Sequence, residues 1–244
     1  MIPKVIHYCW FGGNSLPSLA EKCISSWRKY LPDYEIHQWN ETNFDVNSHP
    51  YTKDAYASGK YAFVSDFVRF KVLYELGGLY FDTDVEIIKP IDDIIEKGPF
   101  MGFEYDGGKR KMAVAPGLGL GAESKMALYE EILDKYDTLP FYLDNGERNP
   151  YTMIPLVTDL LIANGLKGNS GIEQVCGVTV YPQSWFNPFE DSTGRLHKTE
   201  DTRAIHWYAK SWMPKEKGIN VFIKRMARRL LGQDFVSKVG KRIK

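Results

Sequence analysis

The chain has 244 residues, of which 43% are hydrophobic and 14% aromatic, and its formal net charge is zero. This length suits one large or two small α/β domains, and no apolar stretch is long enough to span a bilayer. The chain starts directly into a strand rather than a signal peptide, and its three cysteines lack metal-ligand spacing, so we expect a cytoplasmic protein with reduced thiols.

The first third of the chain predicts alternating strands and helices. Pro3–Trp10 and Tyr34–Trp39 have the pattern of strands, and Pro17–Tyr30 between them has that of a helix. This β-α-β order implies that the two strands pair in parallel. Asn40–Pro50 is polar and is predicted to be a loop. The strongest helix spans Ala62–Leu76 and is stopped by two glycines.

The later elements are expected to be shorter. In chain order they are a helical turn at Ile91–Glu96, a strand at Phe100–Glu104, an antiparallel return at Lys111–Ala115, a glycine-rich bend at Pro116–Gly121, helices at Ser124–Tyr136 and Ile154–Asn164, and strands at Val178–Tyr181 and Thr202–His206. No repeat, low-complexity segment or clear linker divides the chain, so one α/β domain with a terminal appendage is the simplest prediction.

The appendage is strongly basic. From residue 215 to the end there are ten Lys or Arg and two acids, so this tail carries +8 and the rest of the chain −8. Phe222, Ile223, Met226, Leu230 and Leu231 recur within it at helical spacing. Such a helix either lies on an anionic membrane surface or docks on the domain with its charges in water. The acidic body disfavours a nucleic-acid partner.

The most specific pattern is Gly77-Gly78-Leu79-Tyr80-Phe81-Asp82-Thr83-Asp84-Val85-Glu86. It predicts a buried strand with two carboxylates at its end, and in an extended backbone Asp82 and Asp84 point to the same side. Two converging carboxylates suit a hard divalent cation, and such a cation is how proteins hold diphosphates. An isolated Asp-x-Asp is equally typical of a surface turn with solvated acids, so the neighbouring residues decide its meaning.

Those neighbours include two charged residues on the preceding helix. The helix is apolar nearly all round and is therefore expected to be buried, yet Asp66 and Arg69 lie three apart on one face. An exposed ion pair is one explanation, although Lys71 and Glu75 already mark an exposed edge elsewhere. Buried charges need partners, and an Asp and an Arg entering a site can bind sugar hydroxyls and phosphate oxygens.

Three blocks, Ile2–Gly13, Tyr61–Arg69 and Gly77–Val85, closely resemble glycosyltransferase family 32. These are DXD-motif sugar transferases of bacterial capsule and lipopolysaccharide synthesis and yeast mannosyltransferases, and the catalytic domains of the clostridial glucosylating toxins are more distantly similar. The resemblance implies a GT-A fold with a Rossmann-like, mostly parallel sheet, a UDP- or GDP-sugar donor, Mn2+ or Mg2+, and a hexose transferred with retention of configuration.

The resemblance also implies individual roles. Trp10 matches the residue that stacks on the nucleobase, and Asp66 and Arg69 match the pair that holds the donor sugar. Asp82 matches the acid facing the ribose and the sugar, and Asp84 matches the direct metal ligand.

A later segment, Ala204–Trp212, is similar to the family's C-terminal His-Trp…Ser-Trp sequence, although the usual His-His-Trp is here Ile-His-Trp. By this match His206 lies near the metal, and Ser211 and Trp212 lie near the β-phosphate. Arg69 and Ser211 then act as fixed donors to the charge of the leaving diphosphate. Glu104 and Asp106, just after a predicted strand, are candidates for acceptor binding.

Three other functions share individual features with this sequence. A haloacid-dehalogenase-type phosphatase also carries Asp-x-Asp after an apolar strand, but Glu86 stands where its pattern requires Thr or Val. A non-catalytic nucleotide-sugar-binding module would retain the same pocket. A dinucleotide oxidoreductase is disfavoured because the glycines from Gly117 to Gly121 lack the fingerprint's spacing and its helix start.

The sequence therefore predicts a GT-A glycosyltransferase domain at residues 1–213 and a basic amphipathic tail at 214–244. We expect it to act at the inner face of the plasma membrane on a surface polysaccharide or a lipid-linked oligosaccharide.

Overall fold

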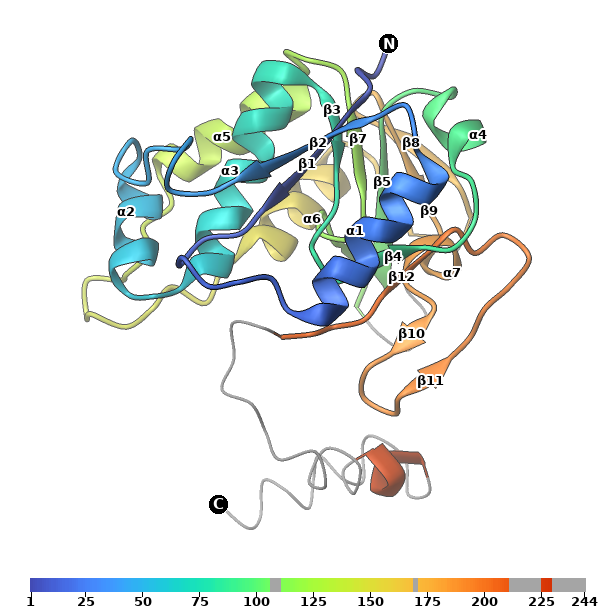
Figure 1. Ribbon diagram of the computed structural model, residues 1–244. Coiled ribbons are helices and arrows are strands. Elements are labelled where there is room, and N and C mark those ends of the chain that lie inside the picture. Colours follow the sequence, from blue (N-terminus) through green and yellow to red (C-terminus); the bar gives the residue numbers. More distant parts are fainter. Residues whose placement is uncertain (106–110, 169–170, 211–224, 230–244) are drawn as a thin grey trace.

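The computed structural model describes residues 1–105, 111–168, 171–210 and 225–229. Within them a mixed eight-stranded sheet forms the centre of the molecule, in the order β2-β1-β3-β7-β5-β9-β8 with β6 paired to β5 (Figure 1). Its strands are β1 (Val5–Cys9), β2 (Glu35–Trp39), β3 (Gly78–Tyr80), β5 (Phe100–Tyr105), β6 (Ala113–Val114), β7 (Leu120–Ala122), β8 (Glu173–Val175) and β9 (Val178–Tyr181).

Most strands of this sheet run in one direction. β1 pairs in parallel with both β2 and β3, and β5 pairs in parallel with β9. β7 runs antiparallel between β3 and β5, which leaves β5 and β9 parallel to the first three strands. The expected α/β, GT-A-type arrangement with a mostly parallel sheet is confirmed.

Helices cover both faces of the sheet. One hydrophobic cluster contains residues of α2, α3, α5 and α6, and a second contains residues of α1, α4 and α7, so the sheet lies between two apolar layers (Figure 1). The helices are α1 (Ser18–Tyr30), α2 (Pro50–Ala57), α3 (Tyr61–Leu76), α4 (Asp92–Ile95), α5 (Ala127–Asp137), α6 (Met153–Ala163) and α7 (Gln183–Phe186).

Two small antiparallel pairs complete the described fold. β4 (Val85–Ile87) follows the Asp-x-Asp motif directly and pairs with β12 (Ala204–His206), so that His206 lies opposite Val85. β10 (Phe189–Glu190) and β11 (Arg195–Leu196) form a hairpin beside this pair. The pairing of β4 with β12 therefore brings the Asp-x-Asp motif and the segment that begins at Ala204 together in space.

Three details differ from the sequence-based expectation. Pro50–Ala57 is a helix, begun by proline in its first turn and capped by the His49 side chain, which accepts a hydrogen bond from the Tyr51 amide. Leu120–Ala122, within the predicted bend, is a central strand. Asp82 to Asp84 turn between β3 and β4 instead of continuing the strand, so their convergence does not follow from strand alternation.

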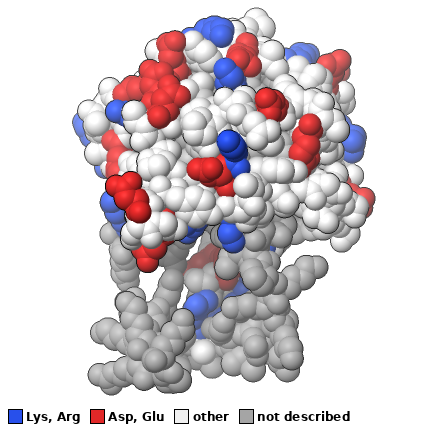
Figure 2. All heavy atoms as spheres, turned by 90° about the vertical axis from the view of Figure 1, so that its left-hand side faces the viewer, with Lys and Arg blue, Asp and Glu red and all other residues white. Residues whose placement is uncertain are grey.

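The side of the molecule that carries α2 has charges of both signs (Figure 2). Figure 2 shows acidic and basic side chains interspersed over the side that carries α2, without a broad basic area. Cys9, Cys23 and Cys176 are free thiols. No helix among the described residues is long and apolar enough to cross a membrane. Of the predicted tail only 225–229 is described, and the boundary at 213/214 lies outside the described residues.

Candidate active site

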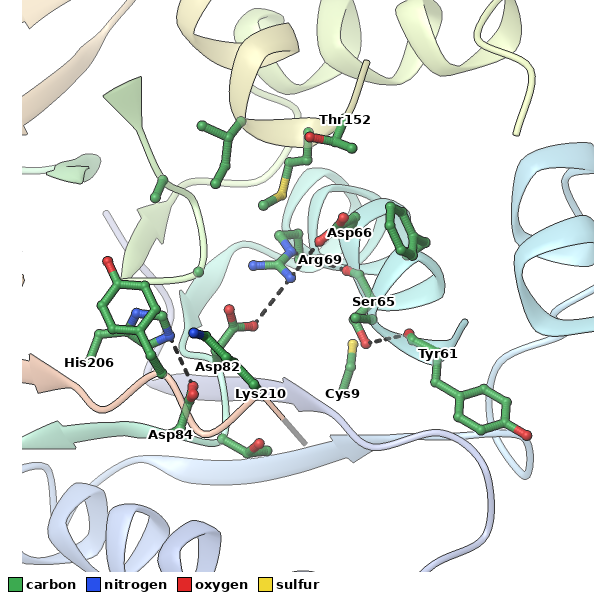
Figure 3. A pocket seen from close by; sticks show the side chains of 18 of the residues that line it. Cys9, Tyr61, Ser65, Asp66, Arg69, Asp82, Asp84, Thr152, His206 and Lys210 are labelled. Carbon is green, nitrogen blue, oxygen red and sulfur yellow. Dashed lines mark hydrogen bonds and ion pairs between the residues drawn. The ribbon is translucent and has the colours of Figure 1, made fainter. Parts of the chain in front are cut away.

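A cavity of about 490 Å³ opens where β1 and β3 end, beside the first turns of α3. Figure 3 shows that charged side chains from elements far apart in sequence enter it. The polar and aromatic residues that line it include Trp10, Tyr61, Ser65, Asp66, Arg69, Asp82, Thr83, Asp84, Glu104, Arg148, His206, Tyr208 and Lys210. This volume is in the range of small-molecule sites.

Arg69 is at the centre of the wall formed by α3. One guanidinium nitrogen, Nη2, contacts Asp66 Oδ1 at 3.0 Å and Asp82 Oδ1 at 3.2 Å, and Nε donates to the Ser65 carbonyl at 3.2 Å. The guanidinium also stacks on the Tyr80 ring, 4.7 Å from its centroid. The remaining nitrogen, Nη1, is buried without a hydrogen-bond partner in the described part of the chain. A buried donor without a partner at a pocket wall suits an anionic or hydroxyl-rich ligand.

Among the acids of this cavity, Asp66 is the one whose charged form is disfavoured by its surroundings. Burial raises the pKa of its carboxyl group to about 6, and the charge of Asp82 acts in the same direction, whereas Arg69 acts against them. Arg69 thus has to neutralise two carboxylates at once. Asp66 and Arg69 form an i,i+3 ion pair that lies in the pocket instead of on an exposed edge, and the exposed edge of α3 is marked by the Lys71–Glu75 pair at 2.8 Å.

A second group of ligating atoms comes from the turn after β3 and from β12. Asp82, Asp84 and His206 each offer one ligand atom, and all three atoms lie within 4.8 Å of one another. His206 Nε2 is 3.1 Å from Asp84 Oδ1, and the other Asp84 oxygen accepts a hydrogen bond from the Ala209 amide at 2.7 Å. Two carboxylates and an imidazole form a donor set that suits Mn2+, and the residues present therefore fit a divalent cation.

The Asp84–His206 contact shifts both pKa values. Burial acts to lower the pKa of His206, but the adjacent Asp84 carboxylate outweighs it and holds the pKa above its usual value. For Asp84, burial acts to raise the pKa, and His206 together with the Ala209 amide lowers it overall. Each of the two side chains therefore favours the charged form of the other at the pocket wall.

The segment after β12 is held in place by the residues that follow the motif. Trp207 donates its main-chain amide to the Asp84 carbonyl at 2.9 Å and its indole N–H to Glu86 Oε2 at 2.8 Å. Lys22 Nζ, from α1, contacts the same Glu86 oxygen at 2.8 Å. Tyr208 and Lys210 both have φ of +50°, an uncommon conformation for residues with side chains. These contacts fix the strained loop over the metal-ligand group.

Glu104 lines the same cavity and contacts Tyr208. Its carboxylate accepts a hydrogen bond from Tyr208 Oη at 3.0 Å, and Tyr208 Oη accepts one from Asn187 Nδ2 at 2.8 Å. Tyr208 also packs on His206, with ring centroids 4.1 Å apart. Glu104 is therefore linked through a single ring to the candidate metal ligands.

Trp10 follows β1 and lines the cavity, as does Tyr61 from the start of α3. The Trp10 indole N–H donates to the Asn14 carbonyl at 2.7 Å, which helps to fix the ring. Gly12, in the loop between them, has φ of +96°, and a Cβ there would lie 2.3 Å from the Tyr61 ring. The loop thus depends on glycine to bring both rings to the pocket.

Most of the predicted site residues lie around this one cavity: Trp10, Asp66, Arg69, Asp82, Asp84, Glu104 and His206. Ser211, Trp212 and Asp106 lie outside the described residues. Sequence reasoning missed Arg148, and it gave no role to Tyr208 or Lys210, although both lie within the matched segment Ala204–Trp212. It also missed Gly117, whose carbonyl accepts the Asp82 amide at 3.1 Å and whose position leaves room for the Asp82 side chain.

Comparison with known proteins adds a family match. Residues 17–101 match the model for the glycosyltransferase sugar-binding region containing a DXD motif. This confirms the resemblance found in the sequence and shows that this part of the chain carries that region.

Two curated proteins of Schizosaccharomyces pombe are similar over part of the chain. Inositol phosphoceramide mannosyltransferase 3 is 32% identical over 101 residues, which cover 38% of this chain and 27% of that protein. Inositol phosphoceramide mannosyltransferase 1 is 28% identical over 107 residues, covering 41% and 33%. The chain thus spans a third or less of the length of these relatives.

Two solved structures align over most of the chain at low identity. A glycosyltransferase involved in the glycosylation of the major capsid of PBCV-1 has 11% identity and a TM-score of 0.49, covering 85% of this chain and 95% of that one. Galactosyltransferase LgtC, in complex with donor and acceptor sugar analogues, has 13% identity and a TM-score of 0.45, covering 93% and 95%.

Proposed function

We propose that this chain, which carries the DXD-containing sugar-binding region of glycosyltransferases at residues 17–101, is a metal-dependent retaining glycosyltransferase. It transfers a hexose from a UDP- or GDP-sugar to a surface polysaccharide or a lipid-linked oligosaccharide. The observation that carries the proposal is the meeting of Asp82, Asp84 and His206 within 4.8 Å, beside the buried Arg69, at the wall of one cavity.

These residues divide the donor between them. Asp84 and His206 would hold the cation, which would supply Lewis-acid stabilisation of the diphosphate leaving group. Arg69, with its unpartnered Nη1, and Lys210 offer positive charge to the donor from two sides of the cavity. Asp66 and Asp82 accept hydrogen bonds from sugar and ribose hydroxyls, and Trp10 stacks on the base.

The arrangement of acids favours direct transfer without a covalent intermediate. A retaining double displacement needs a carboxylate free to act as nucleophile. Asp66 is paired with Arg69, Asp84 faces His206, and Glu104 accepts the Tyr208 hydroxyl. The acceptor hydroxyl therefore attacks on the face from which the diphosphate leaves, and the leaving phosphate takes its proton. Glu104, which lines the cavity beside Tyr208, binds the acceptor.

The class of acceptor and the cellular location are inferred from the names of the similar proteins and from the charge of the tail. The similar yeast proteins are named as mannosyltransferases of inositol phosphoceramide, a lipid. The basic excess of +8 in residues 215–244 suits an anionic lipid surface. We therefore favour a lipid-linked acceptor and a protein peripheral to the inner face of the plasma membrane.

A thermal-shift screen tests the proposed function. UDP-sugars and GDP-sugars are each added with and without Mn2+, because a ligand that binds only the folded state raises the melting temperature. We expect one nucleotide class to raise it only with Mn2+ and to release free sugar slowly. A shift without sugar release indicates a binding module. The proposal is contradicted if no nucleotide sugar shifts the melting temperature and the protein shows phosphatase activity with a trapped aspartyl-phosphate. That result would favour a haloacid-dehalogenase-type phosphatase.

A further inference from the structure

The described part of the basic tail contacts the body of the protein through its arginines. Residues 225–229 form a helical turn, called here the C-terminal turn, which lies against the loop between β10 and β11 (Figure 1). Three arginines donate to four successive carbonyls of this loop. The bonds are Arg225 Nε to Asp191 O (3.1 Å), Arg228 Nη1 to Ser192 O (3.3 Å), Arg229 Nε to Thr193 O (2.6 Å) and Arg229 Nη2 to Gly194 O (3.0 Å).

One of these arginines also shares a carboxylate with the donor cavity. Asp191 Oδ1 contacts Arg225 Nη2 at 2.9 Å, and Asp191 Oδ2 contacts Lys210 Nζ at 2.6 Å. Lys210 lines the cavity with Asp82 and Asp84 (Figure 3). Asp191 itself is outside that lining and is half-buried between the two cations. The C-terminal turn is thus one carboxylate away from a cation of the donor site.

Contacts between side chains also link the C-terminal turn to the loop that carries Lys210. The Arg225 guanidinium lies 5.5 Å from the Phe189 ring centroid, and Phe189 packs on Trp207 with centroids 5.3 Å apart. Gly194 has φ of +66°, and a Cβ at this position would lie 2.9 Å from the Arg225 side chain. The hairpin is therefore shaped to receive Arg225 and contacts the loop that carries Lys210.

A carboxylate shared by two cations binds each less strongly than it would bind one alone. Arg225 offsets part of the Asp191 charge, which lowers the cost of moving the Lys210 ammonium from Asp191 to another anion. The nearest place for such an anion is the cavity that Lys210 lines, where the proposed donor's diphosphate would lie.

We propose that Asp191 and Arg225 are positioning residues that set how readily Lys210 engages a nucleoside diphosphate, so that the C-terminal turn is a working part of the donor site. This inference rests on the proposed function. By linkage, a ligand that draws Lys210 away from Asp191 leaves that carboxylate to Arg225 and strengthens the hold on the C-terminal turn.

Equilibrium binding of UDP and of GDP with Mn2+ to the full chain tests the proposal. Arg225→Gln leaves Asp191 to Lys210 alone and should weaken binding by about threefold, as expected for one partly exposed ion pair. Asp191→Asn frees Lys210 and should bind at least as tightly as the unaltered chain. In the double variant, Arg225→Gln should have no further effect, because the carboxylate through which it acts is gone.

Two further variants separate charge from folding. Arg228→Gln is the matched control and should bind like the unaltered chain, because Arg228 donates to the main-chain carbonyl of Ser192. Arg225→Lys keeps the charge and should restore binding. Equal weakening by Arg225→Gln and Asp191→Asn would mean that they only support the loop, and this overturns the proposal, as does unchanged binding in Arg225→Gln.

Hydrogen exchange provides a second measurement, which does not depend on catalytic turnover. Amides of the C-terminal turn should exchange more slowly when UDP or GDP and Mn2+ are bound, and this protection should be lost in Asp191→Asn. Unchanged exchange on binding contradicts the inference. If the unaltered chain binds neither UDP nor GDP with Mn2+, the proposed function fails instead, so the two failures are distinguishable.

Discussion

Gly117 and Asp82 share a space that admits only one side chain. A Cβ on Gly117 would lie 1.9 Å from Asp82 Oδ2 and 3.2 Å from Arg69 Nη1. The Asp82 amide also donates to the Gly117 carbonyl at 3.1 Å. The loop before β7 therefore packs directly on the Asp-x-Asp turn, and the absence of a side chain at position 117 determines where the Asp82 carboxylate points.

Substitution of Gly117 should damage the site more than the fold. Gly117→Ala should displace Asp82 and weaken Mn2+-dependent nucleotide binding about tenfold or more, with a stability cost of about 1 to 3 kcal/mol from overpacking. Calorimetric binding and thermal melts measure both. The control is Gly98→Ala, which has open space around it and does not line the cavity. Because Gly98 has φ of +99°, the substitution should lower stability by about 1 to 2 kcal/mol through backbone strain and leave binding unchanged. Unaltered binding in Gly117→Ala would refute this account of the glycine.

Asp66 should reduce the stability of the free protein as the pH rises. Its pKa of about 6 lies above the value of about 3.9 for an unfolded aspartate, so the folded state binds the extra proton between these values. Stability is therefore lost as the pH rises through this window, and the loss is complete above pH 6.

Asp66→Asn should consequently raise stability at pH 8 by up to about 3 kcal/mol, with the gain vanishing near pH 4. It should also weaken donor binding, because the amide cannot replace the carboxylate. Urea unfolding at several pH values checks this, with the exposed Asp54→Asn on α2 as control. A gain that does not depend on pH would contradict the assigned pKa.

Removing the charge of Arg69 should lower the free energy of unfolding much more than removing the charge of Lys71. Arg69 is 3% exposed and neutralises Asp66 and Asp82, so Arg69→Gln leaves two carboxylates without their cation and should cost about 3 to 5 kcal/mol. Lys71→Gln, on the same helix, breaks an exposed pair with Glu75 and should cost at most about 0.5 kcal/mol. Similar losses in denaturant unfolding would show that Arg69 is not the central charge of the wall.

The tail should bind anionic lipid through charges beyond the C-terminal turn. Arg225, Arg228 and Arg229 are already used in contacts with the body, so a truncation at residue 215 would disturb the site as well as any membrane contact. Replacing Lys238, Lys241, Arg242 and Lys244 with Gln should reduce binding to vesicles containing phosphatidylserine about tenfold or more and leave nucleotide binding intact. Equal vesicle binding by this variant would exclude the membrane role.

Much of the fold and of the site follows from local patterns in the first hundred residues. The sequence predicts that the Asp-x-Asp motif, the Asp66–Arg69 pair and Trp10 lie at one site. This is possible because periodicity and family resemblance can both be recognised in short stretches of sequence. The same local reasoning missed α2, whose apolar residues are sparse and whose start depends on a His49 cap. It also treated Asp82 to Asp84 as extended, although they form a turn.

The remaining features depend on contacts between distant segments. Gly117 was considered only as part of a nucleotide-binding fingerprint, since its actual role, leaving space for Asp82, requires knowing that β7 lies next to β3. Lys210 lies in the matched segment Ala204–Trp212, but no sequence signal indicates its contact with Asp191, which is created by the hairpin that follows α7. No periodicity or motif encodes such long-range proximity.

The most direct test of the central claim is the binding of UDP and GDP, with and without Mn2+, to the unaltered chain and to Asp84→Asn. We expect one nucleotide to bind the unaltered chain tightly only when Mn2+ is present. In Asp84→Asn this metal-dependent gain should disappear while the protein remains folded. A metal-dependent gain of equal size in Asp84→Asn, or no binding of either nucleotide to the unaltered chain, would contradict the account.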